Sequence, residues 1–298
     1  MSARTTRPTA RRVVVTGIGG TLGRALGALY RSRGAEVVGV SHRADAEAIA
    51  CDRIQHSAQE TLDDARALFE SDPDVVILNA GRIETEVGEA GRPLAGATEA
   101  IHRLNAVFPA LVALAAAERT RSRRLDVVAI GSIADGSPSC FGPVYHASKA
   151  ALHHFVVGTA PILHAADPHL RVRLYRPGVI RGPLSWAPVL RLNDRGRRIR
   201  ARRCEGAPPA DRVATRIADW IEGDAWVGSD PEPLSFRALG LLFGLAPNTY
   251  ARLQHAAWRR GSRFGPEAPA VPALPERGDS EPTAPTRSGL RRAGDHGG

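Results

Sequence analysis

A short apolar run that leads at once into a glycine-rich turn constrains this chain more than any other feature. Residues 13–16 (VVVT) have the length and β-branched character of a buried strand, and Leu22, Leu26 and Tyr30 recur at helical spacing. Because the glycines within residues 17–23 carry no side chain, backbone N–H groups and the helix N-terminus can approach a phosphate. The unit predicts a pyrophosphate cradle, although a glycine turn alone is also typical of a tight connection.

Strand and helix patterns alternate along the rest of the chain. Further strands are expected at residues 37–41, more weakly at 49–51, and then at 75–79, 125–132, 172–177 and 226–228. Helices are expected at about 60–70, at 103–119, after Tyr145 and at 209–222. Such alternation builds a parallel sheet with helices on both faces. We therefore predict an α/β protein with a Rossmann-type, doubly wound parallel sheet.

The length of 298 residues suits one large core rather than two independent domains. We expect a single sheet domain over residues 13–230, followed by a C-terminal helical extension over residues 231–264 that is apolar and then basic. Residues 1–12 form a basic arm, and residues 265–298 are rich in Pro, Gly and charge. Both end segments are predicted to be disordered.

Cysteine content and hydropathy favour a cytoplasmic protein. Cys51, Cys140 and Cys204 are odd in number and form no CxxC pair, which predicts neither a disulfide framework nor a zinc site. The apolar run at residues 13–15 is too short for a signal-peptide core. No window approaches the roughly 18 consecutive apolar residues of a membrane span. We expect a protein that is neither exported nor integral to a membrane.

The net charge of +9 is concentrated in two segments. Residues 1–12 contribute +4 and residues 191–203 contribute +6, so the remaining chain is nearly neutral at −1. These arginines lack interleaved aromatic residues and no DNA-reading motif is present, so no nucleic-acid partner is expected. The segment 191–203 fits three interpretations: a site for an anionic substrate, a contact with acidic lipid, or a solvated helix.

Five further motifs follow the glycine turn. They are Asn79-Ala80-Gly81, Asn105, Ser132, the YxxxK motif from Tyr145 to Lys149, and Pro177-Gly178-Val179. In this order they resemble the short-chain dehydrogenase/reductase family, whose marks are a glycine turn, NAG, an Asn, a Ser, YxxxK and a late PG. The resemblance covers about residues 12–230. It implies an oxidoreductase that binds a nicotinamide dinucleotide.

Tyr145 and Lys149 lie four residues apart, so on a helix their side chains share one face. A nearby ammonium lowers the pKa of tyrosine from about 10, which makes Tyr145 a usable general acid or base. A surface pair has the same spacing, but Lys149 is the sole lysine among 40 basic residues, which indicates a need for a compact ammonium. The resemblance implies that Ser132 hydrogen-bonds the substrate oxygen and that Asn105 supports a water beside Lys149. It also implies that Lys149 holds the nicotinamide ribose.

The resemblance is imperfect at two positions. Thr21 stands where the usual TGxxxGxG turn has its middle glycine, so the turn matches TGxxGxxG through Gly17, Gly20 and Gly23. That variant is common in the extended branch, which acts on sugar nucleotides. Arg181 follows the late PG where the family tends to have Thr, a residue that bonds the nicotinamide carboxamide. Little chain follows the last expected strand, which argues against the larger substrate region of the extended branch.

The residues after the second expected strand favour NADP(H) over NAD(H). An Asp or Glu here would bind the 2′-hydroxyl of NAD and repel a 2′-phosphate, whereas the chain reads Ser41-His42-Arg43. Ser41 with Arg43 suits a phosphate, although Arg43 is also interpretable as one more solvated arginine. Asp52, after the third expected strand, matches the family's adenine-contacting Asp. The expected cofactor contacts are Thr16, Gly17, Gly19, Gly20, Thr21, Leu22, Gly23, Ser41, His42, Arg43, Asp52, Asn79, Ala80, Gly81, Tyr145, Lys149, Pro177, Gly178 and Val179.

Together these features predict an NADP(H)-dependent oxidoreductase that transfers a hydride between nicotinamide and a carbonyl or secondary alcohol. Tyr145 is the expected general acid/base. One alternative is an extended-type sugar-nucleotide reductase or epimerase, and another is a non-catalytic NADP(H)-sensing protein. No metal is expected, because His146, His153 and His154 have no Cys or carboxylate at ligand spacing.

The expected partners are a small carbonyl or alcohol substrate and further copies of the chain. Dimers and tetramers built from the helices near 103–119 and 145–165 are common in the resembling family. Residues 239–263, apolar and then basic, fit weak peripheral membrane contact, or packing on the substrate pocket or a second subunit. Cys140 is expected to line the substrate pocket without a chemical role.

Overall fold

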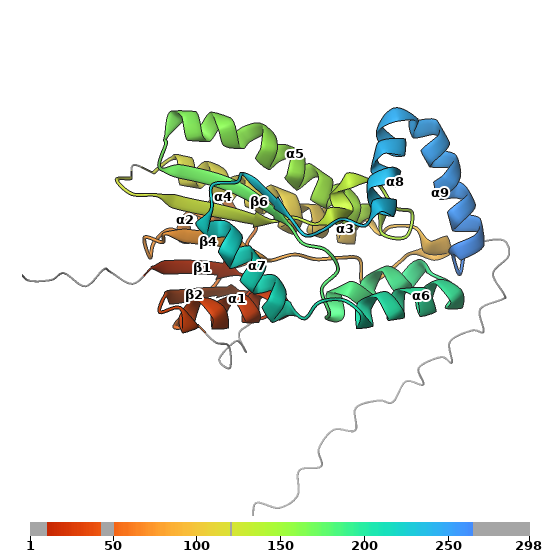
Figure 1. Cartoon of the computed structure of the whole chain (residues 1–298), viewed down its shortest axis with the longest axis horizontal. Helices are drawn as coiled ribbons and strands as arrows, with labels where there is room; N and C mark the ends of the chain where they lie inside the picture. The colour runs from red at the N-terminus through yellow and green to blue at the C-terminus, as the bar shows by residue number, and fades with distance from the viewer. Residues whose placement is uncertain (1–10, 43–50, 120, 265–298) are drawn as a thin grey trace, which may run out of the picture. The chain divides into compact units, whose positions relative to one another are not determined.

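A parallel sheet of seven strands forms the centre of the fold (Figure 1). In this computed structural model the described residues are 11–42, 51–119 and 121–264. The strands are β1 (Arg12–Thr16), β2 (Glu36–Ser41), β3 (Arg53–His56), β4 (Val75–Leu78), β5 (Leu125–Ile130), β6 (Leu170–Arg176) and β7 (Val227–Ser229). They lie in the order β3-β2-β1-β4-β5-β6-β7, and every neighbouring pair is parallel. The predicted doubly wound sheet is confirmed.

The strand order reverses between β1 and β4. The chain runs outward from β1 to β3 and then returns to place β4 on the other side of β1. Val13 pairs with Val75 and Val15 with Ile77, so the two strands end at the same level. Ligands of doubly wound sheets bind at the carboxyl edge where the order reverses. The residues that follow β1 and β4 are therefore placed at the expected binding crevice.

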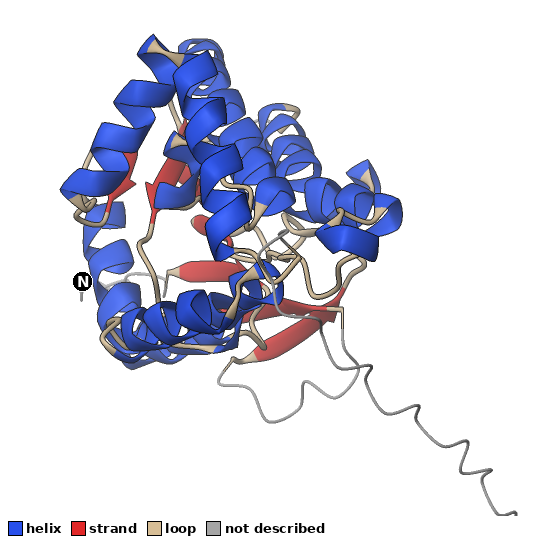
Figure 2. Ribbon diagram, turned by 90° about the vertical axis from the view of Figure 1, so that its right-hand side faces the viewer, coloured by secondary structure: helices blue, strands red, loops and turns tan. Residues whose placement is uncertain are grey.

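Helices cover both faces of the sheet (Figure 2). One layer contains α1 (Thr21–Ser32) and α7 (Ala210–Glu222). The opposite layer contains α2 (Leu62–Ala67), α4 (Phe108–Ala117) and α5 (Pro143–Ala166). Both layers are predominantly apolar toward the sheet, which explains why its central strands read as continuous hydrophobic runs.

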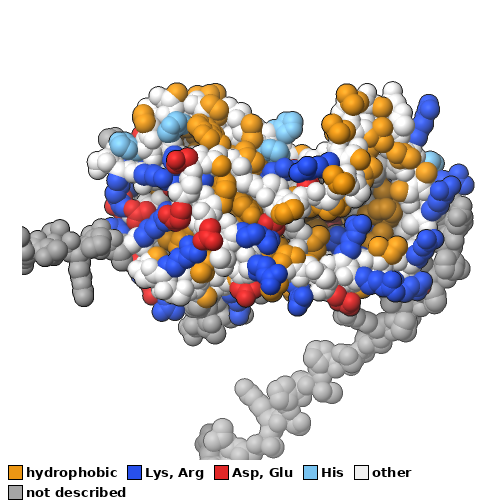
Figure 3. Space-filling model, in the orientation of Figure 1, with side chains coloured by type: hydrophobic (Ala, Val, Ile, Leu, Met, Phe, Trp, Pro, Cys, Tyr) orange, Lys and Arg blue, Asp and Glu red, His pale blue; other side chains and the backbone are white. Residues whose placement is uncertain are grey.

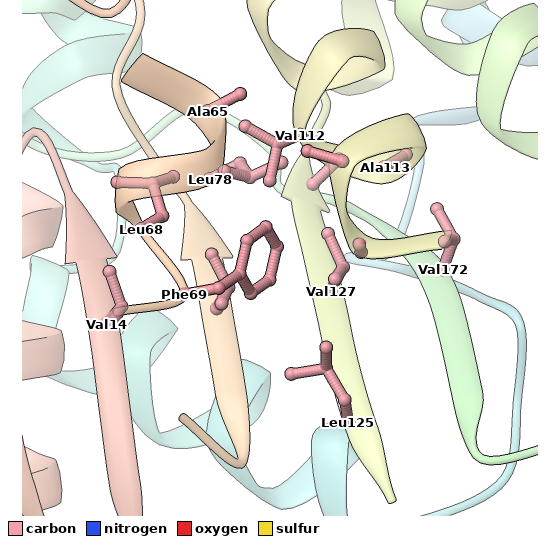
Figure 4. Packing of buried hydrophobic residues seen from close by; sticks show 14 of the residues in the cluster. Val14, Ala65, Leu68, Phe69, Leu78, Val112, Ala113, Leu125, Val127 and Val172 are labelled. Carbon is pink, nitrogen blue, oxygen red and sulfur yellow. The ribbon is translucent and has the colours of Figure 1, made fainter. Parts of the chain in front are cut away.

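Alternate residues of one strand supply the two halves of the core. Val13 and Val15 of β1 pack with the α1–α7 layer, whereas Val14 packs with the α2–α4–α5 layer. Figure 4 shows the second half, in which the Phe69 ring lies between the sheet and α4, near Val127. The buried sheet is a rigid base from which the loops at its carboxyl edge project.

A long helical stretch from Glu89 to Ala117 is, among the described residues, the one helix long and apolar enough to cross a membrane by length and composition. It comprises η2 (Glu89–Gly91), α3 (Ala95–His102), the π-helical turn η3 (Arg103–Val107) and α4. Ile101, Phe108 and Val112 are almost completely buried within the fold. Packing within the fold accounts for part of its apolar character, since 44% of its apolar window is buried.

Helical segments extend beyond the carboxyl edge after three of the strands, β5, β6 and β7. The short η4 (Ile133–Gly136) follows β5, while η5 (Pro183–Arg191) and α6 (Asp194–Glu205) follow β6, and α8 (Leu234–Leu245) and α9 (Pro247–Gly261) follow β7. The Asn193 N–H donates to the Gly261 carbonyl at 2.8 Å, which joins α6 to α9. In Figure 1, α6, α8 and α9 lie together at the right-hand end of the sheet. They belong to the same compact unit as the sheet.

The third strand is the one strand that the sequence misplaced. Its expected position was 49–51, whereas β3 covers Arg53–His56; residues 43–50 lie outside the described part of the chain. β3 is an edge strand with no buried residue, so it lacks the hydrophobic pattern that marked the others. Smaller differences are that the expected helix at 103–119 begins earlier, at Ala95, and that α5 begins at Pro143, before Tyr145.

Candidate functional site

Two positions accept only glycine, one in the turn between β1 and α1 and one in the first turn of α1. Gly17 has φ +63°, and a Cβ there would lie 2.8 Å from the Ala80 Cα. A Cβ at Gly23 would lie 2.2 Å from the carbonyl oxygen of Gly17. Gly20 precedes α1 with extended backbone and no side-chain cap, so the first N–H groups of the helix remain open to an anion. The cradle fits the pyrophosphate of a dinucleotide.

Asn79 ties the end of β4 to this turn. Its Nδ2 donates to the carbonyl oxygens of Thr16 and Gly17 at 3.1 and 3.2 Å. The Ala80 N–H donates to Thr16 Oγ1 at 3.0 Å. Thr16 therefore acts from behind the turn, because its hydroxyl is occupied by the backbone of the next motif.

A cavity of about 800 Å³ opens over the carboxyl ends of the strands. Most expected cofactor residues line it: Gly17, Gly19, Gly20, Thr21, Leu22, Ser41, His42, Asn79, Ala80, Gly81, Tyr145, Lys149, Pro177, Gly178 and Val179. Thr16 and Gly23 support the turn without lining the cavity. The Gly178 N–H donates to Asp230 Oδ2 at 3.0 Å, which fixes the loop after β6.

Two expected cofactor contacts are not placed at this cavity. Asp52 precedes β3 instead of following it; its carboxylate accepts the Val37 N–H at 2.8 Å and pairs with Arg31 at 3.2 Å. It lies near the amino ends of β2 and β3, so its assignment to the adenine is wrong. The error followed from placing the third strand too early. Arg43 lies outside the described residues.

The residues of the YxxxK motif converge with Ser132 at the start of α5. Tyr145 lies in the first turn of that helix and Lys149 lies one turn further. Lys149 Nζ is 5.9 Å from the centre of the Tyr145 ring and donates to the Ile130 carbonyl at 2.8 Å. Ser132 follows β5, and its side chain is within hydrogen-bonding reach of Tyr145. All three predicted side chains line the cavity.

Burial governs the protonation of this group. It raises the pKa of Tyr145, and the hydrogen bond with Ser132 offsets this rise only in part. Burial also lowers the pKa of Lys149 from 10.5 to about 8, against the attraction of Asp135. The expected lowering of the Tyr145 pKa is therefore not found in this structure. The Lys149 ammonium lies over the ring and bonds the Ile130 carbonyl.

Asn105 lies in η3, within the kind of π-helical turn that often occurs at functional sites. Its buried Nδ2 donates to the Arg82 carbonyl at 2.8 Å and to Ser148 Oγ at 2.9 Å, and its Oδ1 accepts the Arg82 N–H at 2.8 Å. A Cβ at Gly81 would lie 3.4 Å from Asn105 Oδ1 and 3.7 Å from Lys149 Nζ, so both residues adjoin the same backbone. Asn105 anchors the loop after β4 to α5 and does not itself line the cavity.

The rest of the cavity is enclosed by residues of η5, α6, α8 and α9. Its apolar lining includes Pro138, Phe141, Leu184, Leu192, Ile199, Phe236, Leu239 and Tyr250. In Figure 3, hydrophobic side chains gather along the hollow beside α8 and α9, with basic side chains around it. Cys140 does not line it, contrary to expectation: its N–H donates to Gln254 Oε1 at 2.8 Å, and burial raises the pKa of its thiol to about 11.

The sequence model of the family described as short chain dehydrogenase matches residues 11–188. The chain belongs to the short-chain dehydrogenase family. It is accordingly an NAD(P)-dependent oxidoreductase that binds a nicotinamide cofactor. No curated protein matches the sequence.

Solved short-chain dehydrogenases share this fold at low sequence identity. One from Burkholderia cenocepacia J2315, in complex with NADP, is 16% identical, with 82% of this chain and 97% of that chain covered and a TM-score of 0.64. One from Streptomyces avermitilis is 20% identical, with coverage of 84% and 97% and a TM-score of 0.59. BdcA in complex with NADPH is 18% identical, with coverage of 74% and 93% and a TM-score of 0.59. These likenesses confirm the Rossmann-type architecture.

Sequence reasoning missed the ion pair that holds the start of α5 in this dehydrogenase. Glu84 and Arg191 are 3% and 1% exposed and pair at 3.0 Å across 107 residues of sequence. The two Glu84 oxygens accept the N–H groups of Val144 and Tyr145, each at 3.3 Å. Arg191 also donates to the Gly91 carbonyl at 2.8 Å. The carboxylate thus caps α5 next to Tyr145, where the helix dipole favours negative charge.

A second buried carboxylate, Asp135, lies close enough to Tyr145 and Lys149 for its charge to act on both. His153 Nδ1 lies 2.9 Å from it, and Arg176 Nε donates to it at 2.8 Å. Burial acts to raise the pKa of Asp135, but the hydrogen bonds from His153 and Arg176 lower it overall. Asp135 therefore stays ionised, and its charge favours the ammonium form of Lys149. No sequence motif marked this group.

Proposed function

We propose that this dehydrogenase catalyses the NADP(H)-dependent interconversion of a carbonyl and a secondary alcohol, with Tyr145 as general acid/base. The observation that carries the proposal is the presence of Ser132, Tyr145 and Lys149 in the same cavity as the glycine cradle. When bound, the nicotinamide supplies or accepts the hydride. The protein residues then have to orient the substrate oxygen and move one proton.

The protonation states favour the reduction of a carbonyl. Because burial raises its pKa, Tyr145 is a neutral phenol at pH 7 and can donate its proton to the carbonyl oxygen while the carbon receives the hydride. Ser132 is within reach of Tyr145 and would hold the same oxygen. The Lys149 ammonium, charged below about pH 8, stabilises the phenolate that remains until solvent returns a proton.

NADP(H) is the proposed cofactor in preference to NAD(H). Ser41 and His42 at the carboxyl end of β2 line the cavity, and neither carries the carboxylate that would repel a 2′-phosphate. Two similar structures are described as complexes with NADP and with NADPH. Fluorescence titration with NADPH and NADH tests this choice, and tighter binding of NADH would overturn it.

Replacement of Tyr145 tests the mechanism. The Tyr145→Phe variant is expected to lose turnover of carbonyl substrates by at least about 100-fold while binding NADPH nearly as tightly as the wild type, because only the transferable proton is removed. Tyr30→Phe is the matched control, since the buried Tyr30 hydroxyl has no hydrogen-bond partner among the described residues and lies in the core beneath α1. Normal turnover by Tyr145→Phe would remove the proposed role.

We also propose that the enzyme is a dimer or tetramer assembled through α4 and α5. Large apolar side chains remain exposed along these helices and η3, namely Val107, Leu114, Val157 and Ile162, at 46, 43, 47 and 68%. Burying such side chains is a typical gain of subunit association. Light scattering measures the mass of the wild type and of Ile162→Lys, and the substitution is expected to lower that mass. A wild-type protein that is already a monomer, with a mass that Ile162→Lys does not change, would contradict the proposal.

A cytoplasmic location and weak peripheral membrane contact complete the proposed setting. The three cysteines are free, which suits a reducing compartment.

The proposed membrane contact is made by α8. On this helix Leu234, Leu241 and Leu245 are 80, 65 and 84% exposed, as an interfacial helix requires. Co-sedimentation with vesicles measures this contact, and the absence of any binding would exclude it.

A further inference from the structure

One face of α6, the helix that contains most of the arginine-rich segment, lines the cavity. Gly196, Ile199, Arg200 and Arg203 line the cavity, and their spacing of three and four residues places them on a single helical face. The other arginines of α6 are exposed and do not line it: Arg195, Arg197, Arg198 and Arg202. The segment is therefore divided into a solvent face and a cavity face.

Arg200 is the half-buried cation of that cavity face. Its Nε donates to the Ser185 carbonyl at 2.8 Å, which holds the guanidinium in place. Within the described part of the chain no carboxylate pairs with Arg200, whereas the buried Arg191 and Arg173 pair with Glu84 and Asp126 at 3.0 and 3.2 Å. A cation removed from water without an acidic partner is suited to receive an anion from outside.

The location of Arg200 points to the substrate rather than to the cofactor. It is close enough to Tyr145 for the charges of the two groups to influence one another. Glu60, which follows β3, is the one acid among the described lining residues. The part of the cavity beyond Tyr145 therefore combines apolar walls with an uncompensated positive charge.

We propose that the substrate carries a carboxylate or phosphate group that Arg200 binds, with an apolar body against Leu184, Leu192 and Ile199. This inference rests on the proposed function for the reacting carbonyl, but its anion site is formed by Arg200 of α6, which the Ser185 carbonyl of η5 holds in place. Arg203, on the same face and exposed, lies one turn further along the helix and attracts the anion during entry. The preferred ligands are amphipathic anions.

Binding of matched eight-carbon ligands tests the anion site independently of turnover. Octanoate, octyl phosphate and octanamide are titrated by calorimetry into the full-length protein, with and without NADP⁺. At least one of the two anions is expected to bind about tenfold or more tightly than octanamide, and Arg200→Gln is expected to abolish that preference. The tighter of the two anions identifies the head group as carboxylate or phosphate.

Arg198→Gln is the matched control, because it removes the same charge from the exposed face of the same helix. It is expected to change the affinities by less than about twofold. Equal binding of octanamide and both anions would overturn the proposal. An equal loss in Arg198→Gln and Arg200→Gln would overturn it too, since it would reveal only a diffuse electrostatic attraction.

A turnover comparison separates this inference from the proposed function. NADPH oxidation is followed with 2-oxooctanoate, 3-oxooctanoate and their methyl esters. Arg200→Gln is expected to raise KM for the preferred acid about tenfold while leaving KM for its ester unchanged. Turnover of esters and acids alike would overturn the anion site and keep the oxidoreductase. Arg200-dependent anion binding without any turnover would keep the anion site and overturn the proposed carbonyl reduction.

Discussion

The cofactor side and the substrate side of the cavity are constructed by opposite means. On the cofactor side the geometry depends on missing side chains, since Gly17 and Gly23 let backbone segments come into direct contact. On the substrate side it depends on long charged side chains that join distant segments, such as Arg191, which reaches both Glu84 and the Gly91 carbonyl. One side is shaped by close packing and the other by buried ion pairs.

The two sides are expected to respond differently to substitution. The glycine cradle leaves no space for an added methyl group. A substitution there therefore distorts only the local turn, and the effect falls on the groups that would bind the pyrophosphate. A buried ion pair contributes little net stability as a whole, but the loss of one partner leaves an uncompensated charge. The substrate side is therefore the more sensitive to single substitutions and the more tolerant of paired ones.

Removal of Arg191 is expected to have the largest effect. Arg191→Met leaves the Glu84 carboxylate buried without its partner, which lowers the free energy of unfolding by about 3–5 kcal/mol. Turnover falls as well, because Glu84 accepts the Tyr145 N–H at the start of α5. Urea denaturation, followed by circular dichroism, measures the first effect.

A second substitution distinguishes the ion pair from simple loss of packing. Glu84→Gln combined with Arg191→Met keeps an acceptor for the N–H groups of α5 but removes the unpaired charge, so it is expected to recover part of the lost stability. If the double variant is as unstable as the sum of the two single variants, the residues do not act as a pair. The exposed Arg198→Met is expected to lie within about 0.5 kcal/mol of the wild type.

The corresponding change on the cofactor side is Gly23→Ala. Its Cβ would lie 2.2 Å from the Gly17 carbonyl oxygen, so the turn must open, with a loss of about 1–3 kcal/mol in stability and a weaker hold on NADPH. Gly158→Ala is the matched control, because nothing lies within 4 Å of a Cβ there and alanine favours the helix by about 0.5–1 kcal/mol. Unchanged NADPH affinity in Gly23→Ala would show that the cradle does not hold the cofactor as described.

The sequence was sufficient for the cofactor side because its information is local. Gly17 and Gly23 lie close together in sequence around the start of α1, and Tyr145 and Lys149 are one helical turn apart, so spacing alone reports their proximity. The five central strands β2, β1, β4, β5 and β6 were recognisable because both of their faces are covered, which makes them continuous apolar runs. Asn105 was identified by its motif, whereas its anchoring role emerged only from its bonds to Arg82 and Ser148.

The substrate side could not be predicted in the same way. Glu84 and Arg191 are 107 residues apart, and nothing near either residue in the sequence indicates its partner. The polar edge strand β3 gave no hydrophobic signal, and the wrong placement of Asp52 followed from that. The division of α6 into two faces depends on the direction in which Arg200 points, which tertiary packing decides.

The smallest expected effect is a pH dependence that links the two sides through Lys149. In the free enzyme the pKa of Lys149 is about 8. We therefore expect kcat/KM for NADPH to fall as the pH rises through 8, by up to about tenfold per pH unit. The reason is that the neutral amine no longer attracts the cofactor or supports the phenolate. The lowered pKa of Lys149 also affects folding stability. Below about pH 8 the cost of burying the charged ammonium is fully present, and above pH 10.5 it disappears. The free energy of unfolding is therefore expected to rise between about pH 8 and 10.5. In Lys149→Arg the guanidinium stays charged throughout, and the fall near pH 8 should vanish even if overall activity is lower. A fall that persists unchanged in Lys149→Arg would have to arise from another group, and the buried ammonium would then not control the coupling between cofactor binding and proton transfer.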